Sequence, residues 1–275
     1  MCVGLLALAV LFRNDPTMNT FTTAPITNQA SEESRQPIHH ILCYGDSLTL
    51  GLSPPDNITA DTYCPYSIPL KSLLDQHYSP GSRVHVDHLG NSGKTTTQLL
   101  KHVKNPKMGL LPALRQGPPD GYKVVIILAG TNDILRLLRS NVGLEKAANY
   151  LVRNLWTFHE MARQEGAHHS LAVGIPPSKY QHQLVDASQL VTMVNKQLQE
   201  RMAASANHNN MTFVPFPFPF EAPPQQHDNN NHTNTTKSLW SRDGLHLSCL
   251  GYEALAQALA PVVVSILDNT VLVPG

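Results

Sequence analysis

Five short apolar segments recur along the chain, and each is followed by a loop rich in polar residues or glycine. They lie near 38–44, 83–88, 123–129, 170–175 and 211–214. Runs of this length, bounded by turn residues and rich in β-branched side chains, predict β-strands. The segment near 123–129 is continuously apolar, which is typical of a strand buried on both faces. The sequence therefore predicts five strands.

Helical periodicity fills the intervals between these strands. Apolar residues recur three and four positions apart near 66–78, 95–103, 144–165 and 184–205, and again near 250–267. This spacing gives each helix one apolar face. Strands that alternate with helices predict a parallel sheet with helices on both faces. The expected fold class is therefore α/β, a three-layer α/β/α sandwich.

Two parts of the chain do not fit this alternation. Residues 1–37 combine an apolar N-terminal segment, at 2–12, with a linker rich in Thr, Asn, Ser, Gln and Pro, which is typical of disorder. Residues 215–238 begin with prolines at alternate positions, which exclude a central strand. We expect one domain over 38–268, interrupted by this long loop insert, and a short tail at 269–275.

Composition narrows the classes of partner. Lys plus Arg equals Asp plus Glu at 20 each, and no basic stretch stands out, which argues against nucleic acid as a partner. The apolar stretch at 2–12 is shorter than the ~20 residues that span a bilayer, so we expect no stable membrane insertion. It resembles the apolar part of a signal peptide, without a basic start or a clear cleavage site. This slightly favours secretion, with a cytoplasmic location as the alternative.

The four cysteines and fourteen histidines do not have the spacing of metal-binding motifs. Cys43 lies inside the first predicted strand and is expected to be a buried thiol. A disulfide between Cys64 and Cys249 is one pairing that the sequence permits without establishing it. The histidine pairs at 39–40 and 168–169 are expected in solvated turns before strands. We therefore expect no metal site.

Two polar motifs, far apart along the chain, together suggest nucleophilic catalysis. Gly-Asp-Ser-Leu at 45–48 places Ser47 at the end of the first predicted strand. Asp-Gly-Leu-His at 243–246 places Asp243 and His246 three residues apart, so the carboxylate can hold one imidazole nitrogen and leave the other free. A hydroxyl nucleophile needs a base, and the base needs an orienting carboxylate. We predict that Ser47, His246 and Asp243 form a catalytic triad.

Two further motifs offer groups that can hold a negatively charged oxygen. Gly-Asn-Ser-Gly at 90–93 ends in Gly93, where the backbone can approach a substrate closely and donate its N–H. Gly-Thr-Asn-Asp at 130–133 places Asn132 after a buried strand, at the end where ligands bind in open α/β sheets. We predict an oxyanion hole made by the N–H groups of Ser47 and Gly93 and the side chain of Asn132.

Some of these polar residues also have structural interpretations. Asn132 is an alternative N-cap for a helix that begins near Ile134. Asp46 and Asp133 are expected to be structural hydrogen-bond acceptors. Trp240 is expected either to line the substrate pocket or to pack beneath the last motif. Local packing is also expected of the aromatic residues in the insert, which are Phe216, Phe218 and Phe220.

In this order and at these distances, the motifs resemble those of the SGNH hydrolases, also called GDSL esterases and lipases. The resemblance covers roughly residues 38 to 266, and the matching positions are Ser47, Gly93, Asn132, Asp243 and His246. It implies a flavodoxin-like five-stranded parallel sheet with strand order 2-1-3-4-5. It also implies a serine esterase that forms an acyl-serine intermediate and needs no cofactor.

The resemblance implies a small-molecule ester as substrate and leaves its identity open. Short-chain esters, acetylated sugars, lysophospholipids and thioesters all occur as substrates in the family. The shape of the surrounding loops decides among them, and the motifs do not.

Two other functions compete with ester hydrolysis. The segment 88–95 resembles a nucleotide-binding P-loop between a strand and a helix. However, His88 stands where that motif needs glycine, and the apolar run at 124–128 ends in Ala-Gly rather than in a metal-binding Asp. The other alternative is a catalytically inactive module on the same fold that binds carbohydrate or lipid, although all five catalytic positions are filled.

Overall fold

Five parallel strands form the central sheet in the computed structural model of the chain, which describes residues 38–54, 62–78, 83–222 and 238–271. In chain order they are β1 (Ile38–Gly45), β4 (Arg83–Gly90), β5 (Val124–Leu128), β6 (His169–Val173) and β7 (Met211–Val214). Their spatial order is β4-β1-β5-β6-β7, and all neighbouring pairs are parallel. Counted within this sheet, the order is 2-1-3-4-5, so the flavodoxin-like topology is confirmed.

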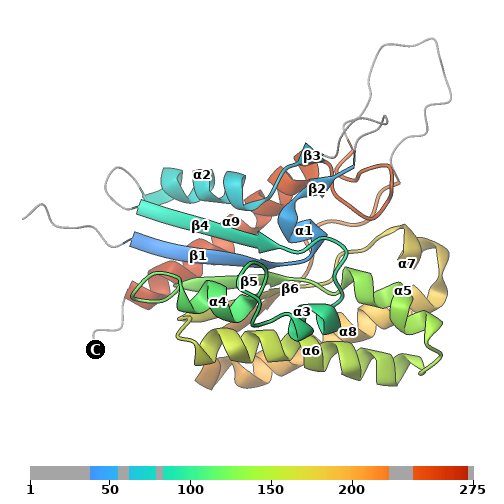
Figure 1. Cartoon of the computed structure of the whole chain (residues 1–275). Coiled ribbons are helices and arrows are strands. Elements are labelled where there is room, and N and C mark those ends of the chain that lie inside the picture. Colours follow the sequence, from blue (N-terminus) through green and yellow to red (C-terminus); the bar gives the residue numbers. More distant parts are fainter. Residues whose placement is uncertain (1–37, 55–61, 79–82, 223–237, 272–275) are drawn as a thin grey trace, which may run out of the picture. The chain divides into compact units, whose positions relative to one another are not determined.

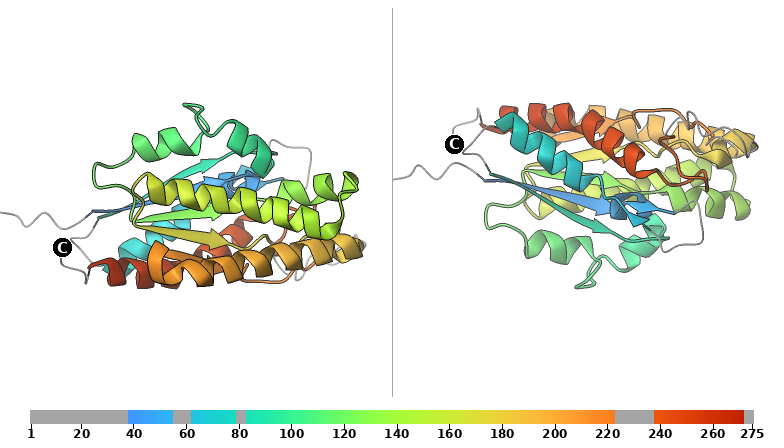
Figure 2. Two further views of the ribbon diagram at one scale, coloured as in Figure 1. Left: turned by 90° about the horizontal axis from the view of Figure 1, so that it is seen from below. Right: turned by 90° about the horizontal axis from the view of Figure 1, so that it is seen from above.

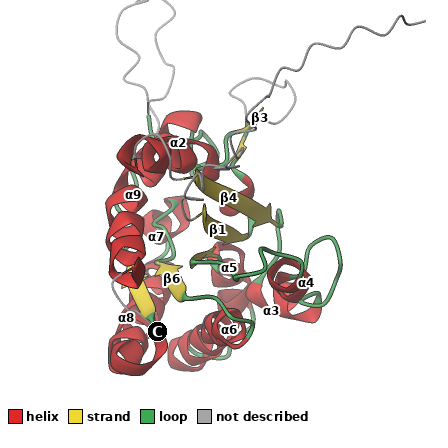
Figure 3. Cartoon of the chain, turned by 90° about the vertical axis from the view of Figure 1, so that its left-hand side faces the viewer, coloured by secondary structure: helices red, strands yellow, loops and turns green. Residues whose placement is uncertain are grey.

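Helices cover both faces of this sheet, as Figures 1 and 3 show. The helices α2 (Ser67–Tyr78) and α9 (Cys249–Val271) lie against one face. The long helices α6 (Leu144–Gln164) and α8 (Val185–Asn209) lie against the other face, and the two views in Figure 2 present each helical layer in turn. The expected three-layer α/β/α sandwich is therefore confirmed.

The alternation of side chains along β1 explains why the sheet has a core on each face. Successive side chains of a strand point to opposite faces. Ile41 and Cys43 pack in the cluster with α2 and α9, whereas Leu42 and Tyr44 pack in the cluster with α6 and α8. The central strand β5 is buried throughout, as its continuous apolar run predicts.

One helix of the described part, α9, is long and apolar enough over Cys249–Asn269 to cross a membrane, judged by length and composition alone. Its residues Leu255, Leu259 and Val263 are fully buried in the cluster that also contains α2 and one face of the sheet. Packing within the fold therefore accounts for the apolar composition of these positions. The absence of stable membrane insertion stays a prediction.

Short elements, most of which helical or strand periodicity does not reveal, surround the sheet. They are α1 (Ser47–Leu50), β2 (Leu52–Ser53), β3 (Thr62–Tyr63), α3 (Thr96–Lys101), α4 (Leu110–Arg115), α5 (Thr131–Arg139) and α7 (Lys179–Gln183). Of these, only α3 and the later part of α5 were predicted. Most of them span too few residues for a repeating apolar face to show.

The expectation that the histidine pairs lie in solvated turns is wrong for three of the four residues. His39 and His40 lie inside β1, and the His40 ring stacks on His85 of β4. His169 begins β6, where burial lowers its pKa to about 4. Only His168 lies in an exposed bend. Among the residues that the structure describes, no group of three or more His, Cys, Asp or Glu side chains is placed to hold a metal ion.

Three segments with sequence-based expectations lie outside the described residues. They are 1–37, most of the insert at 223–237, and 272–275. The expected N-terminal segment, linker and tail, and the domain boundaries drawn from them, therefore stay predictions. The described elements all fall within the compact unit Gln36–Gly275.

Candidate active site

The carboxyl ends of three neighbouring strands lie at the same level of the sheet. Gly45 at the end of β1 is paired with Gly90 on β4 and with Leu128 on β5. The backbone N–H of Asn91 continues this alignment by donating to the carbonyl of Gly45 at 2.9 Å. Three motifs follow these aligned positions directly, and they carry Ser47, Gly93 and Asn132. The register of the sheet therefore brings these three residues to one edge.

Ser47 begins α1, a single helical turn that follows β1 directly. Asp46 is the N-cap of this turn, and its side chain accepts a hydrogen bond from the N–H of Leu48 at 3.0 Å. Gly45 must remain glycine because a Cβ there would lie 1.9 Å from the carbonyl oxygen of Leu128. The Gly-Asp-Ser-Leu sequence therefore supplies both the close approach and the cap that hold Ser47 at the strand end.

Ser47 and His246 meet in space although 199 positions separate them in the chain. The Ser47 Oγ lies 2.9 Å from the His246 Nε2, and the two residues are only 5% and 9% exposed. On the other side of the ring, Nδ1 lies 2.5 Å from one carboxylate oxygen of Asp243. The second oxygen of Asp243 accepts the backbone N–H groups of Leu245 and His246, both at 2.9 Å. An imidazole thus stands between a hydroxyl and a carboxylate.

The surroundings of Asp243 keep its carboxyl group ionised. Burial raises its pKa, but the hydrogen bonds from His246 and Leu245 together outweigh burial and lower the pKa to about 2. An ionised carboxylate holds a proton on the nearer nitrogen of His246. The other nitrogen is then free to accept the proton of a hydroxyl group.

Two other carboxyl groups near the strand ends have the opposite character. Burial raises the pKa of Asp46 to about 7 and that of Asp133 to about 6, although hydrogen bonds oppose burial in both cases. Asp133 accepts from the backbone N–H of Thr96 at 2.8 Å and from its Oγ1 at 2.7 Å. Asn154 donates in turn to the Thr96 Oγ1 at 3.0 Å. Both aspartates are thus hydrogen-bond acceptors, as expected, and the contributions of Thr96 and Asn154 were not predicted.

Asn132 lies in the first turn of α5, and it is not the helix cap. The helix begins at Thr131 rather than near Ile134, and its N-cap is Gly130, which has a left-handed φ of +111°. The expected alternative role of Asn132 as an N-cap is therefore wrong. Its side-chain amide instead donates to the carbonyl of Lys94 at 3.1 Å. This bond ties α5 to the loop that follows β4.

Gly93, in the same loop, has a left-handed backbone that favours glycine. Its φ is +69°, and no atom lies within 4 Å of the position that a Cβ would take. Gly93 therefore faces open space beside the strand ends. A cavity of about 440 Å³ opens there, and its lining residues are Gly93, Thr95, Gln98, Asn132, Leu135, Arg136 and Arg139. Two of the predicted oxyanion residues thus border one cavity.

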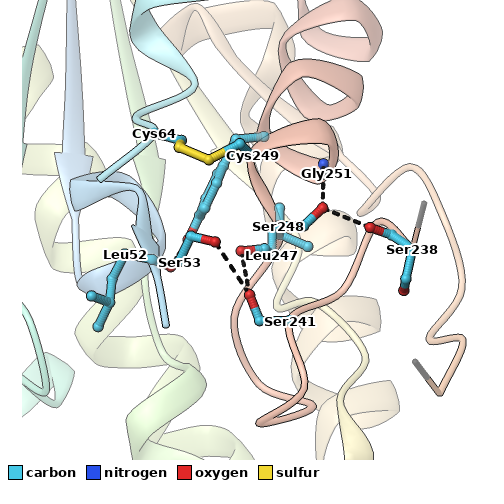
Figure 4. The surroundings of a disulfide bond; sticks show 10 residues. Leu52, Ser53, Cys64, Ser238, Ser241, Leu247, Ser248, Cys249 and Gly251 are labelled. Atoms are coloured by element: carbon cyan, nitrogen blue, oxygen red, sulfur yellow. Dashed lines mark hydrogen bonds between the residues drawn. A yellow bond between two sulfur atoms is a disulfide. The ribbon is translucent and has the colours of Figure 1, made fainter. Parts of the chain in front are cut away.

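A disulfide joins the segment after Ser47 to the segment after His246, as Figure 4 shows. It links Cys64, beside β3, to Cys249, the first residue of α9, across a Cα–Cα distance of 5.3 Å. Near it, the Oγ of Ser241 donates to the carbonyl of Leu247 at 2.8 Å. The sequence left this pairing open. Cys43 is a buried free thiol, as expected, and burial raises its pKa to about 12.

Trp240 packs beneath the segment that carries Asp243 and His246. It is 2% exposed, it pairs with Leu247 through an isolated β-bridge, and its indole N–H donates to the carbonyl of Pro219 at 2.9 Å. Of its two expected roles, the structure shows the packing role. The aromatic rings that surround it at centroid distances up to 6.0 Å are those of Phe216, Phe218 and Phe220. Local packing of these rings is therefore confirmed.

The family of the chain follows from a match to most of its length. The family model described as the GDSL-like lipase/acylhydrolase family matches residues 43–254. The chain belongs to this family. It is therefore a carboxylic ester hydrolase, as the sequence analysis expected. No curated protein matches the chain.

Solved structures with a similar fold include several esterases. The aryl esterase of M. smegmatis is 21% identical, with a TM-score of 0.54 over 83% of this chain and 99% of that one. A carbohydrate acetylesterase family member from Sinorhizobium meliloti is 17% identical, with a TM-score of 0.54 over 84% and 99% of the chains. TesA is 20% identical, with a TM-score of 0.53 over 83% and 99%. At these identities the likeness concerns the fold alone.

Proposed function

We propose that this hydrolase cleaves small-molecule carboxylic esters through an acyl-serine intermediate on Ser47. His246 acts as the general base and Asp243 orients it. One observation carries the proposal, namely the unbroken chain of hydrogen bonds from the Asp243 carboxylate through both nitrogens of His246 to the Ser47 Oγ.

The acylation step follows from this geometry. The His246 Nε2 accepts the hydroxyl proton as the Ser47 Oγ attacks the ester carbonyl carbon. The Asp243 carboxylate, which its low pKa of about 2 keeps ionised, stabilises the imidazolium that forms. The imidazolium then donates its proton to the departing alkoxide as the C–O bond breaks, and an alcohol leaves.

Deacylation repeats these roles with water. His246 accepts a proton from the attacking water, and its proton returns to the Ser47 Oγ when the acyl–oxygen bond breaks. A carboxylic acid is released and the free serine is restored. These protein groups and water supply every proton and bond in the cycle, so the proposal requires no cofactor.

The negative charge that develops on the carbonyl oxygen needs fixed donors. We assign this role to the backbone N–H groups of Ser47 and Gly93 and to the side-chain amide of Asn132. An amide nitrogen carries two hydrogens. One hydrogen of Asn132 is held by the carbonyl of Lys94, which fixes the amide plane and leaves the second for the oxyanion. The open space around Gly93 supports this assignment.

Replacement of the nucleophile tests the proposal directly. Ser47→Ala should reduce turnover of p-nitrophenyl acetate to the uncatalysed rate while the melting temperature stays close to that of the wild type. A fluorophosphonate probe should label Ser47 in the wild type, as peptide mass spectrometry can show. Ser72→Ala, at an exposed position on α2, is the matched control and should retain full activity. Substantial turnover by Ser47→Ala, or labelling at another residue, would contradict the proposal.

A further inference from the structure

Two arginines lie on the same face of α5 as Asn132. Positions three, four and seven residues apart share one face of a helix, so Arg136 and Arg139 follow Asn132 along it. All three side chains line the 440 Å³ cavity that Gly93 also borders. At a rise of 1.5 Å per residue, the two arginines stand about 6 and 10 Å beyond Asn132 along the helix axis.

Within the part of the chain that the structure describes, neither arginine forms a salt bridge. Asp133 is the one acidic residue of α5, and both of its oxygens are occupied by Thr96. Its interaction with Arg136 is Coulombic and not a hydrogen bond.

The position of the two arginines is not explained by the helix itself. Like charges one turn apart repel each other by a few tenths of a kcal/mol. Cations near the C-terminal end of a helix do favour its dipole. That effect does not require the side chains to line a cavity, whereas both Arg136 and Arg139 line this one.

Positively charged side chains also line a neighbouring cavity. A second cavity of about 400 Å³ shares Gln98 and Arg136 with the first. Its lining includes a further cation, Lys146, the apolar side chains of Leu137 and Val142, and the hydrogen-bonded Asp133. Arg136 therefore stands where the two cavities meet, with Arg139 lining the first cavity and Lys146 lining the second.

We propose that Arg136 and Arg139 form an anion-binding subsite, and that the enzyme prefers esters that carry a negatively charged group one to two helical turns from the scissile carbonyl. The inference rests on the proposed function, because that function places the ester carbonyl between Gly93 and Asn132. A guanidinium presents paired N–H donors that match a carboxylate or a phosphate. Arg136 and Arg139 are thus specificity-determining residues and take no part in bond breaking.

Two matched pairs of esters test this subsite from both sides of the ester bond. Mono-p-nitrophenyl glutarate and p-nitrophenyl pentanoate differ in charge on the acyl side. The 3-carboxyphenyl and phenyl esters of butyric acid differ in charge on the alcohol side. The wild type should prefer the charged ester, by kcat/KM, in at least one pair. Added salt should weaken this preference, because exposed charges are screened.

Substitution of the arginines should remove the preference selectively. In the double variant Arg136→Gln/Arg139→Gln, the charged-to-neutral ratio of kcat/KM should fall about tenfold, the lower end for hydrogen bonds to charged groups. The neutral ester of each pair is the reference, so the ratio cancels any change that affects both esters alike. The Arg136→Lys/Arg139→Lys variant keeps the charge and should retain part of the preference, which a purely structural role would not predict.

A charge-matched control distinguishes binding at a local subsite from an effect of the protein's overall electrostatic field. Arg83→Gln/Arg163→Gln removes the same charge from two exposed positions, at the start of β4 and near the end of α6, and should leave the preference intact. An equal loss in this control would overturn the subsite. So would a wild type without preference in either pair, or a preference that survives in the Gln/Gln variant. Failure of the wild type to hydrolyse the neutral esters would instead count against the esterase mechanism.

Discussion

Replacing Asp46 by Asn should change how the stability of the protein depends on pH near neutrality. Asp46 is fully buried directly before Ser47, and its side chain accepts the N–H of Leu48 at the start of α1. Burial raises the pKa of this carboxyl to about 7, although the bond from Leu48 opposes the rise. The folded protein therefore keeps Asp46 protonated below neutral pH and ionised above it.

The sign of the effect follows from proton binding in the two states. The ordinary pKa of the carboxyl, taken for the unfolded chain, is 3.8. Between pH 3.8 and about 7 the unfolded chain has released this proton and the folded protein still holds it. The free energy of unfolding therefore falls as the pH rises through this window. One pKa unit is worth ~1.36 kcal/mol, so the full cost is on the order of 4 kcal/mol.

Asparagine imitates the protonated carboxyl group and cannot ionise. It keeps an oxygen acceptor for the N–H of Leu48 and has nearly the same shape. Urea unfolding of the wild type and of Asp46→Asn at about pH 5, 6, 7 and 8 gives the free energy of unfolding of each. Relative to the wild type, Asp46→Asn should gain about 2 kcal/mol between pH 5 and 7, because the slope of ~1.36 kcal/mol per pH unit falls to half as the pH reaches the folded pKa of about 7. Taking the difference cancels the titration of groups that do not interact with Asp46.

Asp243→Asn is a matched control because the pKa of Asp243 is shifted in the opposite direction. Burial raises that pKa, but the hydrogen bonds from His246 and Leu245 lower it overall to about 2. The stability that it contributes is present above pH 3.8 and is lost as the pH falls toward 2. The titration of Asp243 itself should therefore add no slope to this difference between about pH 5 and 8, a range in which the difference for Asp46→Asn should change steeply. A constant difference for Asp46→Asn would refute the reasoning.

Two further predictions concern the disulfide and the catalytic base. The Cys64–Cys249 bond spans a sequence separation of 185, and chain entropy predicts about 5 kcal/mol for a loop of this length. Cys64→Ser/Cys249→Ser should therefore melt at a clearly lower temperature, and an unchanged melting curve would contradict this. A general base must be unprotonated to accept the Ser47 proton, so kcat/KM should fall in acid solution, with no step from Asp243 between about pH 5 and 8, because its pKa of about 2 lies below that range. A flat profile would argue against a histidine base.

The sequence predicted the sheet well because its strands carry strong local signals. The run at 124–128 is apolar at every position and is β5 in the structure, buried throughout. The long helices α6 and α8 also lie within a few residues of their predicted ranges, because their apolar faces repeat over many turns. The predicted site residues Ser47, Asp243 and His246 were recognisable because each stands in a short motif of fixed spacing.

What the sequence did not reveal depends on contacts between separate elements. The hydrogen bonds from Thr96 and Asn154 around Asp133 join α3, α5 and α6, and no local sequence pattern predicts them. The start of α5 was missed because its cap is Gly130, which caps through backbone conformation and not through a side chain. Arg136 was missed for the same reason, because its spacing of four from Asn132 places the two residues on one helix face only if the helix begins at Thr131.

Asn132 separates this mechanism from a serine hydrolase whose oxyanion hole consists of backbone groups alone. Its amide is fixed by the carbonyl of Lys94 at 3.1 Å, and it borders the same cavity as Gly93. Asn132→Asp would replace a donor by a carboxylate that faces both this carbonyl and the developing oxyanion. The fold should tolerate the change, because an acidic residue in the first turn of a helix interacts favourably with its dipole.

The activity of Asn132→Asp should therefore fall while its melting temperature stays nearly unchanged. Loss of one oxyanion donor lowers kcat by roughly 10²–10³, and the effect falls on kcat rather than on KM because the donor acts mainly in the transition state. Asn132→Ala should lose a similar factor. The melting temperature of the aspartate variant should stay close to that of the wild type. Asn269→Asp, an exposed position near the end of α9, controls for the added charge. Because the helix cap is Gly130, low activity cannot be ascribed to a lost cap, and a stable, fully active Asn132→Asp would exclude Asn132 from the oxyanion hole.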